Sequence, residues 1–264
     1  MDEPWKLTVW GVRGSFPNPH ADFLEYGGNT SCLSLNCGDT LVVLDAGSGM
    51  VPLGRQVLRE KRRRVDILLS HLHLDHVIGL FPFAPLHDSS VEVHLYGTPE
   101  MIRALVRLVG PPLWPVGLSD CRAKVRFHTF RPGDRFPLDA VSVTTLEGSH
   151  PGGCVYYRLE GQGRSLVYAL DCELEEDTAS RLTAFARGTD LLIWDANYTS
   201  ADLKRGWGHS TWAQGLELGQ AAGAKQVLMT HYSSGCCDEF LREQEALAAG
   251  PLSRFAKEGM VMEL

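Results

Sequence analysis

Short runs of β-branched and other apolar residues recur along the chain, and they predict strands. Most of the runs have few polar positions, which is typical of strands that are buried on both faces. The predicted strands cover residues 7–10, 33–36, 41–44, 65–69, 91–96, 141–146, 155–159, 166–170, 191–194 and 226–229. We therefore expect a protein built around β-sheets.

Segments with apolar residues at helical spacing lie between these runs and predict helices. Gly, Pro, Ser, Thr or Asp residues bound each segment, as expected of helix ends and turns. The predicted helices cover residues 53–60, 101–109, 173–185, 212–222 and 239–248. Hairpin-like strand pairs dominate the first part of the chain and helices separate the later strands. This order predicts mixed sheets covered by helices on their outer faces.

No linker or low-complexity stretch divides the chain, so we expect one domain over residues 1–264. The most irregular stretch, residues 110–117, is rich in Gly and Pro. It predicts a loop beside the functional site rather than a domain boundary. A hydrophobic content of 44% excludes a disordered chain.

Composition and charge narrow the classes of function. No apolar run approaches the roughly 18 residues that cross a bilayer, and the opening MDEPW lacks the features of an export signal, so we expect a cytoplasmic protein without membrane contact. Seven scattered cysteines, never in two CxxC pairs, predict reduced thiols. A net charge of −7 argues against broad attraction to nucleic acid. Assembly into a homo-oligomer stays open.

The residues with the clearest chemistry follow the apolar run at 65–69, in the sequence His71-Leu72-His73-Leu74-Asp75-His76. Residues two apart in an extended chain share a face, so His71 and His73 can hold one metal ion. Where the chain turns toward a helix that begins near residue 77, Asp75 and His76 are carried to another side, where a second ion can bind. Imidazole and carboxylate together favour zinc, manganese or iron over calcium or magnesium.

Further candidate ligands come after other predicted strands. Asp171 and His231 directly end apolar runs, and His150 follows another run after a few residues. All three are expected at one edge of the sheets. Asp45 also ends a strand and precedes a glycine-containing turn, so it is expected to orient a ligand from behind. The remaining histidines in loops or strands are predicted to be structural: His20, His87, His94 and His128.

Residues 71–76 form an intact HxHxDH motif, and with it the sequence resembles the metallo-β-lactamase superfamily. The resemblance extends from Leu44-Asp45-Ala46-Gly47 to Thr230-His231 in the family's usual order. Gly208-His209-Ser210-Thr211 resembles the histidine motif of the ribonuclease Z and cyclic phosphodiesterase branch. The resemblance implies an α/β (α+β) fold, a four-layer αβ/βα sandwich with the site at the shared edge of two sheets.

The resemblance also implies a role for each candidate residue. His71, His73 and His150 would hold one metal ion, Asp75, His76 and His231 the other, and Asp171 would bridge the two. Asp45 would support a ligand, and Asp75 and His209 are the predicted catalytic residues, His209 as proton donor. Two divalent ions about 3.5–4 Å apart would activate a shared water as nucleophile. Zinc is preferred, with manganese and iron as alternatives.

Cys172 is an alternative to Asp171, because strand ends can be misplaced by one residue. True β-lactamases commonly carry a cysteine at the bridging position, so an aspartate there argues against antibiotic hydrolysis. We prefer Asp171, because the side chain of Cys172 would face the other side of the strand end.

The expected substrate is a small-molecule phosphodiester, open or cyclic. The chain lacks both the glycine-rich basic arm with which ribonuclease Z holds transfer RNA and the cysteine cluster of the C–P lyase phosphodiesterase, so folded RNA is not expected as a partner. Arg13 and Asn29 lie in glycine-containing segments and could contact a phosphate, although roles in turns explain both equally well.

Two other functions stay open. A thioester or lactone hydrolase of the glyoxalase-II type would use the same centre on a carbonyl group, and the His209 motif argues against it. A non-catalytic metal-bound sensor module would not need a full ligand set. His209 itself has a structural alternative, as the neighbour of a helix N-cap near Ser210 or Thr211.

Overall fold

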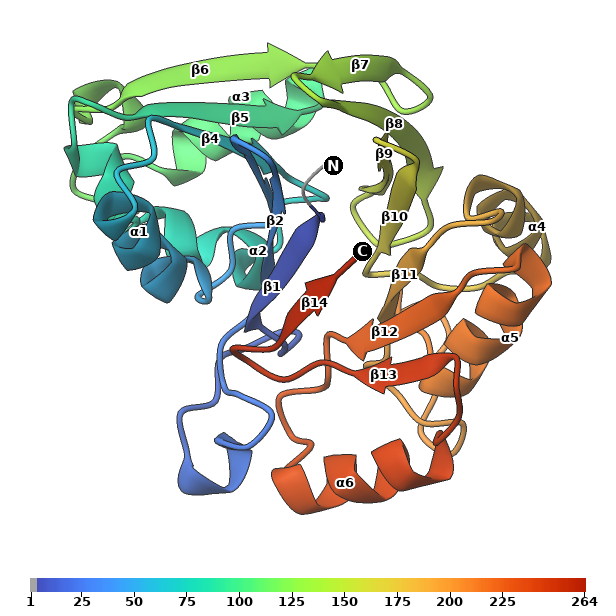
Figure 1. Cartoon of the computed structure of the whole chain (residues 1–264). Coiled ribbons are helices and arrows are strands. Elements are labelled where there is room, and N and C mark those ends of the chain that lie inside the picture. Colours follow the sequence, from blue (N-terminus) through green and yellow to red (C-terminus); the bar gives the residue numbers. More distant parts are fainter. Residues whose placement is uncertain (1–3) are drawn as a thin grey trace.

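Two β-sheets packed face to face form the centre of the molecule (Figure 1). The structure is a computed structural model that describes residues 4–264. Each sheet has seven strands, and the helices lie on the two outer faces. These are the four layers of an αβ/βα sandwich, so the predicted fold class is confirmed.

The first sheet has the strand order β14-β1-β2-β3-β4-β5-β6. Its strands are β1 (Lys6–Gly11), β2 (Cys32–Cys37), β3 (Thr40–Leu44), β4 (Arg64–Leu68), β5 (Glu92–Gly97), β6 (Lys124–Thr129) and β14 (Val261–Glu263). Helices α1 (Met50–Arg59), α2 (Leu74–Val77) and α3 (Pro99–Leu108) belong to this half. Strands β3 to β6 run parallel, whereas β1 is antiparallel to both β2 and β14.

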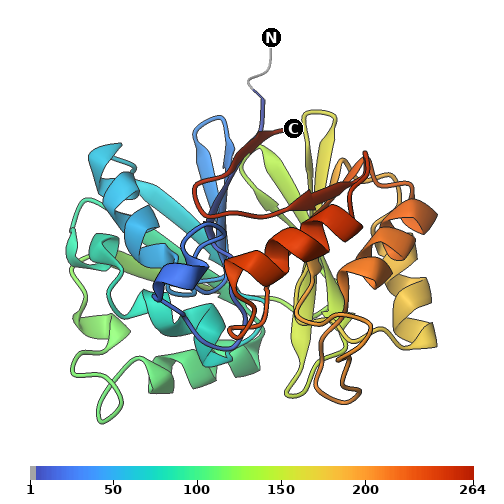
Figure 2. The same cartoon turned by 90° about the horizontal axis from the view of Figure 1, so that it is seen from below.

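The second sheet has the order β13-β12-β11-β10-β9-β8-β7. Its strands are β7 (Arg135–Leu138), β8 (Val141–Gly148), β9 (Cys154–Gly161), β10 (Arg164–Ala169), β11 (Leu191–Asp195), β12 (Gln226–Thr230) and β13 (Ser253–Phe255). Helices α4 (Glu176–Phe185) and α5 (Trp212–Ala222) cover its outer face, whereas α6 (Asp238–Leu247) lies along the edge of the molecule next to β13, at the front of the view from below in Figure 2. Both halves pass from antiparallel strands to parallel strands joined by helices, so the topology repeats itself.

Successive side chains of a buried strand point to opposite faces of the sheet and pack into two different hydrophobic clusters. In β3, Val42 and Leu44 join the cluster that includes strands of both sheets, whereas Leu41 and Val43 join the cluster with α1 and α3. Both sides of the strand are therefore apolar, which explains its continuous hydrophobic run. The same packing fixes the direction of each strand end and so the direction of the residues that follow it.

The predicted strands and long helices are all present, with boundary differences and four strands missed. The missed strands are β6, β7, β13 and β14. One boundary changes the site: the helix after the metal motif was expected near residue 77 but begins at Leu74. Asp75 and His76 therefore belong to a helical turn rather than to the approach to one.

Both ends of the described chain meet in the first sheet, where β14 pairs with β1. Between residues 4 and 264, no helix combines the length and the apolar character that a membrane crossing requires. The expectation that no export signal is present rests on residues 1–5, of which the first three lie outside the described part of the chain.

Candidate metal centre

Three candidate residues follow directly on, or one residue after, buried parallel strands, and all three have left-handed backbone conformations. Asp45 after β3, Asp171 after β10 and His231 after β12 have φ angles of 59°, 53° and 62°. For residues other than glycine this conformation costs about 1–3 kcal/mol and persists only where the surroundings impose it. The strain turns these side chains to the carboxyl ends of the parallel strands, where α/β folds commonly place their ligands.

The HxHxDH segment changes from extended to helical in its middle, and this change divides its ligands. His73 is still extended, with ψ at 147°, and α2 begins at the next residue. The donor atoms of the candidate ligands form two main groups, each within 4.8 Å: one of His71, His73, His150 and Asp171, and one of Asp75, His76 and His231. These two groups contain the residues that the resemblance assigns to the two ions.

Asp171 lies between the two groups, with one carboxylate oxygen toward each. Its Oδ1 lies 3.9 Å from Nε2 of His71 and 3.5 Å from Nε2 of His150. Its Oδ2 lies 2.9 Å from Nε2 of His76 and 3.3 Å from Nε2 of His231. A carboxylate in this position can bind one ion through each oxygen.

The donor atoms fit metal ions better than they fit one another. Nε2 of His71 and Oδ2 of Asp171 are buried without a hydrogen bond of good geometry, and Nε2 of His76 lies only 3.1 Å from Nε2 of His231. Burial holds the pKa of His71 well below its usual value, which keeps the imidazole in the neutral form that binds metal. Mixed imidazole and carboxylate donors suit zinc, manganese or iron.

The carboxylates of the centre are buried, so they need positive charge nearby to stabilise their ionised form. Burial alone would raise the pKa of Asp75, yet the imidazoles of His76 and His231 hold it far below its usual range. Burial likewise disfavours the charged imidazole of His231, but Asp171 and Asp195 raise its pKa to about 10. Buried charges require partners, and divalent cations between these carboxylates would provide them.

Asp45 lies behind His76 and fixes the direction of its ring. Oδ2 of Asp45 is 2.7 Å from Nδ1 of His76, which leaves Nε2 for the metal. The same carboxylate accepts hydrogen bonds from the backbone N–H and hydroxyl of Ser70, both at 2.7 Å, and from the hydroxyl of Tyr168 at 2.6 Å. Ser70 and Tyr168 had no role in the sequence analysis, because serine and tyrosine in apolar strands are common without function.

His209 is held by Asp195, a fully buried residue that the sequence analysis missed. Nδ1 of His209 lies 2.9 Å from Oδ2 of Asp195. Asp195 ends β11 directly after an apolar run, much as Asp171 follows β10, so a signal for it was present. The N-cap of α5 is Thr211, which accepts a hydrogen bond from the backbone of Gln214, so His209 is not needed for capping. Possible metal-binding atoms of His209, Asp171 and His231 also lie within 4.8 Å of one another.

The structure separates Asp171 from its alternative, Cys172. The Cys172 thiol is fully buried, burial raises its pKa to about 12, and its backbone N–H donates to Asp195 at 3.2 Å. A neutral thiol inside the core is a poor ligand. Of the two residues, Asp171 is the one whose carboxylate faces both groups of candidate ligands.

Arg13 and Asn29, the two residues considered for contact with a phosphate, hydrogen-bond to other parts of the protein. Arg13 is fully buried, where its guanidinium donates to the carbonyls of Gly27 at 2.6 Å and Cys236 at 2.5 Å. Asn29 binds the carboxylate of Glu258 through its backbone and side-chain N–H groups. Both residues hold loops together, which is the alternative that their glycine-containing segments allowed.

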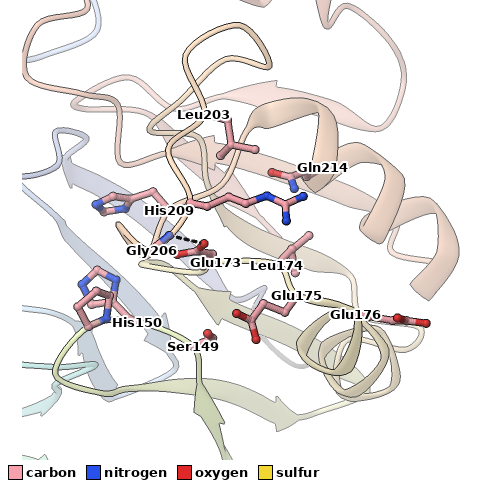
Figure 3. Close-up of a pocket in the computed structure, with 12 residues that line it drawn as sticks. Ser149, His150, Glu173, Leu174, Glu175, Glu176, Leu203, Gly206, His209 and Gln214 are labelled. Carbon is pink, nitrogen blue, oxygen red and sulfur yellow. Dashed lines mark hydrogen bonds between the residues drawn. The ribbon is translucent and has the colours of Figure 1, made fainter.

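A cavity of about 670 Å³ opens beside His150 and His209 (Figure 3). Glu173, Glu175 and Glu176 line it together with Arg205. Its volume is typical of small-molecule sites, and its acidic wall disfavours a highly charged anion.

Comparison with known proteins identifies a family and several relatives. A family model described as "Beta-lactamase superfamily domain" matches residues 40–232. "Probable metallo-hydrolase YhfI" of Bacillus subtilis is 25% identical over 98% of this chain and 99% of its own sequence. The crystal structure of YhfI has a TM-score of 0.79 and 23% identity, and the match covers both chains in full. Ribonuclease Z of Archaeoglobus fulgidus is 24% identical over 87% of this chain and 88% of its own. The crystal structure titled "a New Diphosphatase from the PhnP Family" has a TM-score of 0.75, 21% identity and 98% coverage of each chain.

Proposed function

This chain belongs to the β-lactamase superfamily and is a metallo-hydrolase, and we propose that it is a phosphodiesterase acting on small or cyclic phosphodiesters with two divalent metal ions. Zinc is the preferred metal, with manganese or iron as alternatives. The observation that carries the proposal is that Asp171 lies between the two groups of candidate ligands and 3.7 Å from His209, whose ring a second buried carboxylate, Asp195, holds.

His71, His73 and His150 would hold one ion, and Asp75, His76 and His231 the other. When bound, such a pair of ions lowers the pKa of a water molecule and polarises phosphoryl oxygens. Asp171 would keep the two groups at a fixed separation. Asp45 holds the ring of His76, which keeps Nε2 directed at its ion.

His209 supplies what a phosphodiester needs and a thioester does not. An alkoxide leaving group is a strong base, so its departure requires a proton. Asp195 accepts from Nδ1 of His209 and leaves Nε2 as the nitrogen that can donate. A thiolate leaves without such help, which disfavours the thioester hydrolase. The sensor alternative does not need a histidine held for proton transfer.

The size and charge of the cavity favour a small substrate. About 670 Å³ accommodates a nucleotide-sized molecule, and three glutamates on its wall oppose a second phosphate group. The names of two relatives, a ribonuclease and a diphosphatase, both denote hydrolysis at phosphorus. The overall charge of −7 gives no support for RNA as the substrate.

Rates on bis-p-nitrophenyl phosphate, 2′,3′- and 3′,5′-cyclic nucleotides, a lactone and a glutathione thioester, with metal analysis of the same sample, would test the proposal. We expect metal-dependent turnover of at least one phosphodiester and little turnover of the carbonyl substrates. Faster hydrolysis of the thioester or lactone would favour the glyoxalase-II type. Two bound metals without turnover of any substrate would favour the sensor.

A further inference from the structure

Glu173 connects three segments that meet at the centre. Its backbone N–H donates to the carbonyl of Ser149 at 3.0 Å, beside His150. Its Oε1 accepts from the backbone N–H of Gly206 at 2.6 Å, and its Oε2 accepts from that of Gly208 at 2.8 Å. Figure 3 shows the bond to Gly206, with the rings of both His150 and His209 on one side of it. Each oxygen of the carboxylate accepts one backbone N–H of the loop, so Glu173 is attached to the loop at two points.

The loop of residues 199–208 depends on these bonds for its attachment. Within the part of the chain that the structure describes, Glu173 is the only side chain outside the loop that hydrogen-bonds residues 199–207. Lys204 and Arg205 are exposed, and 61% of Trp207 is exposed. The loop nevertheless forms part of the cavity wall through Leu203, Arg205 and Gly206. Packing therefore does little to hold this wall in place.

The second bond reaches a metal-binding histidine through one more contact. The carbonyl of Gly208 lies 2.8 Å from Nδ1 of His150. A carbonyl can only accept, so Nδ1 carries the proton and Nε2 has the lone pair. Gly208 has a φ of 79°, and a Cβ there would lie 2.0 Å from Nδ1 of His150. The loop backbone must therefore approach the ring closely, and Glu173 holds it at that distance.

We propose that Glu173 is a positioning residue that latches the 199–208 loop against the centre and, through the carbonyl of Gly208, fixes the ring and tautomer of His150. This inference rests on the proposed metal centre, in which each group of ligands forms the half-site for one ion. It adds a residue that controls one of these two half-sites. The half-site of His71, His73 and His150 depends on the latch, whereas the half-site of Asp75, His76 and His231 does not. His209 follows the loop directly and would lose part of its positioning with it.

Two variants and a matched control test the latch. Glu173→Ala removes both acceptors, whereas Glu173→Gln keeps one amide oxygen and turns an N–H₂ group toward the other loop N–H. Asp177→Asn removes a nearby exposed carboxylate of α4 whose ion partner is Arg181, outside the centre. Thermal unfolding of each protein establishes that it is folded before the comparison.

Trypsin cleavage after Lys204 and Arg205 measures the latch without reference to metal or activity. Two lost hydrogen bonds should raise the cleavage rate of Glu173→Ala about tenfold or more, with Glu173→Gln between it and the wild type. Asp177→Asn should match the wild type. Cleavage of Glu173→Ala at the wild-type rate would overturn the latch.

Chelator competition with Zn²⁺ measures the positioning of His150. We expect one of the two ions to bind about 10–100-fold more weakly in Glu173→Ala and the other to bind unchanged. Faster cleavage with both affinities unchanged would overturn the link to His150. A wild-type protein that binds no Zn²⁺ would overturn the proposed metal centre instead, and the cleavage comparison would still decide the latch.

Discussion

Nδ1 of His209 lies 2.9 Å from Oδ2 of Asp195, and this contact determines which nitrogen of the imidazole can transfer a proton. The carboxylate is fully buried and also accepts the backbone N–H of Cys172 at 3.2 Å and, through Oδ1, that of Asn197 at 3.0 Å. Two backbone N–H groups therefore hold the carboxylate of Asp195 in place, in addition to its contact with His209. Rigid support of this kind is what a proton donor needs to meet a leaving oxygen.

Replacing His209 by alanine should separate proton donation from metal binding. We expect His209→Ala to retain both metal ions and to slow an alkyl phosphodiester by about 10²–10⁴-fold, because the alkoxide must leave without a proton. Activated nitrophenyl esters should lose far less, since nitrophenolate is a good leaving group. Rates on both esters, with metal analysis, check this. An equal loss on both esters would refute the acid role, and loss of a metal ion would identify His209 as a ligand.

Asp195→Asn should reproduce the His209→Ala pattern in weaker form. The amide keeps the shape of the carboxylate and an acceptor oxygen, but it no longer stabilises an imidazolium. We expect a loss of roughly 10–100-fold on the alkyl ester. The double variant with His209→Ala should be no slower than His209→Ala alone, because Asp195 acts through His209. Additive losses in the double variant would mean that Asp195 has a separate role.

Asp171 and Cys172 should differ sharply in their effect on metal content. Asp171→Asn removes the charge between the two groups of ligands, so at least one ion should be lost on dialysis. Cys172→Ala leaves the ligands in place and removes only a buried thiol. We expect it to keep both ions and to lower the melting temperature by about 2–4 °C. Metal loss from Cys172→Ala, with Asp171→Asn fully loaded, would reverse the assignment.

Removal of metal should destabilise the whole fold. The ligands come from both halves of the chain, and without metal no cation of residues 4–264 other than imidazolium would face the buried carboxylates of Asp75 and Asp171, although Asp75 also accepts the backbone N–H of Ser15 at 2.7 Å. A ligand present at about 100–1,000 times its Kd contributes roughly 3–4 kcal/mol, so the melting temperature should fall on chelation and recover when Zn²⁺ returns. Scanning calorimetry of both forms measures this. Identical melting curves would show that the centre binds no structural metal.

Arg13 should affect stability but not catalysis. Arg13→Lys keeps the charge but loses the fork that reaches the carbonyls of Gly27 and Cys236. We expect a loss of about 1–3 kcal/mol in the free energy of unfolding, measured by urea titration. The KM for a phosphodiester should stay at the wild-type value. A raised KM with an unchanged free energy of unfolding would instead support a contact between Arg13 and the phosphate of the substrate.

The buried strands were predictable because both of their faces are apolar. Strands β6 and β7 were missed because each lies at the edge of its sheet, where β6 has only exposed and half-buried residues and β7 contains Pro137. Edge strands tolerate both features. Strands β13 and β14 have three residues each, too few for a periodic signal. The repeated topology of the two halves was also invisible, because different side chains build the same order of strands.

The ligand residues were predictable because most of them end apolar strands, and Asp195 shows that the same rule could have been applied once more. Glu173 had no such signal. Its partners are backbone N–H groups of a glycine-containing loop, and no side-chain pattern encodes them. The burial of Arg13 was not predictable either, for a different reason. A glycine on either side suggests an exposed turn, but burial by the distant residues 232–238 decides where the guanidinium lies.

The pairing of β14 with β1 has a consequence for how the protein is made. The first sheet contains residues 6–129 but gains its outermost strand only at residues 261–263. During synthesis, the free edge of β1 therefore stays exposed until residues 261–263 have been made. Exposed strand edges promote association between unfinished molecules. For a time, the nascent chain thus contains a first sheet that lacks only its edge strand β14. The candidate ligands of the second half are synthesised during the same time.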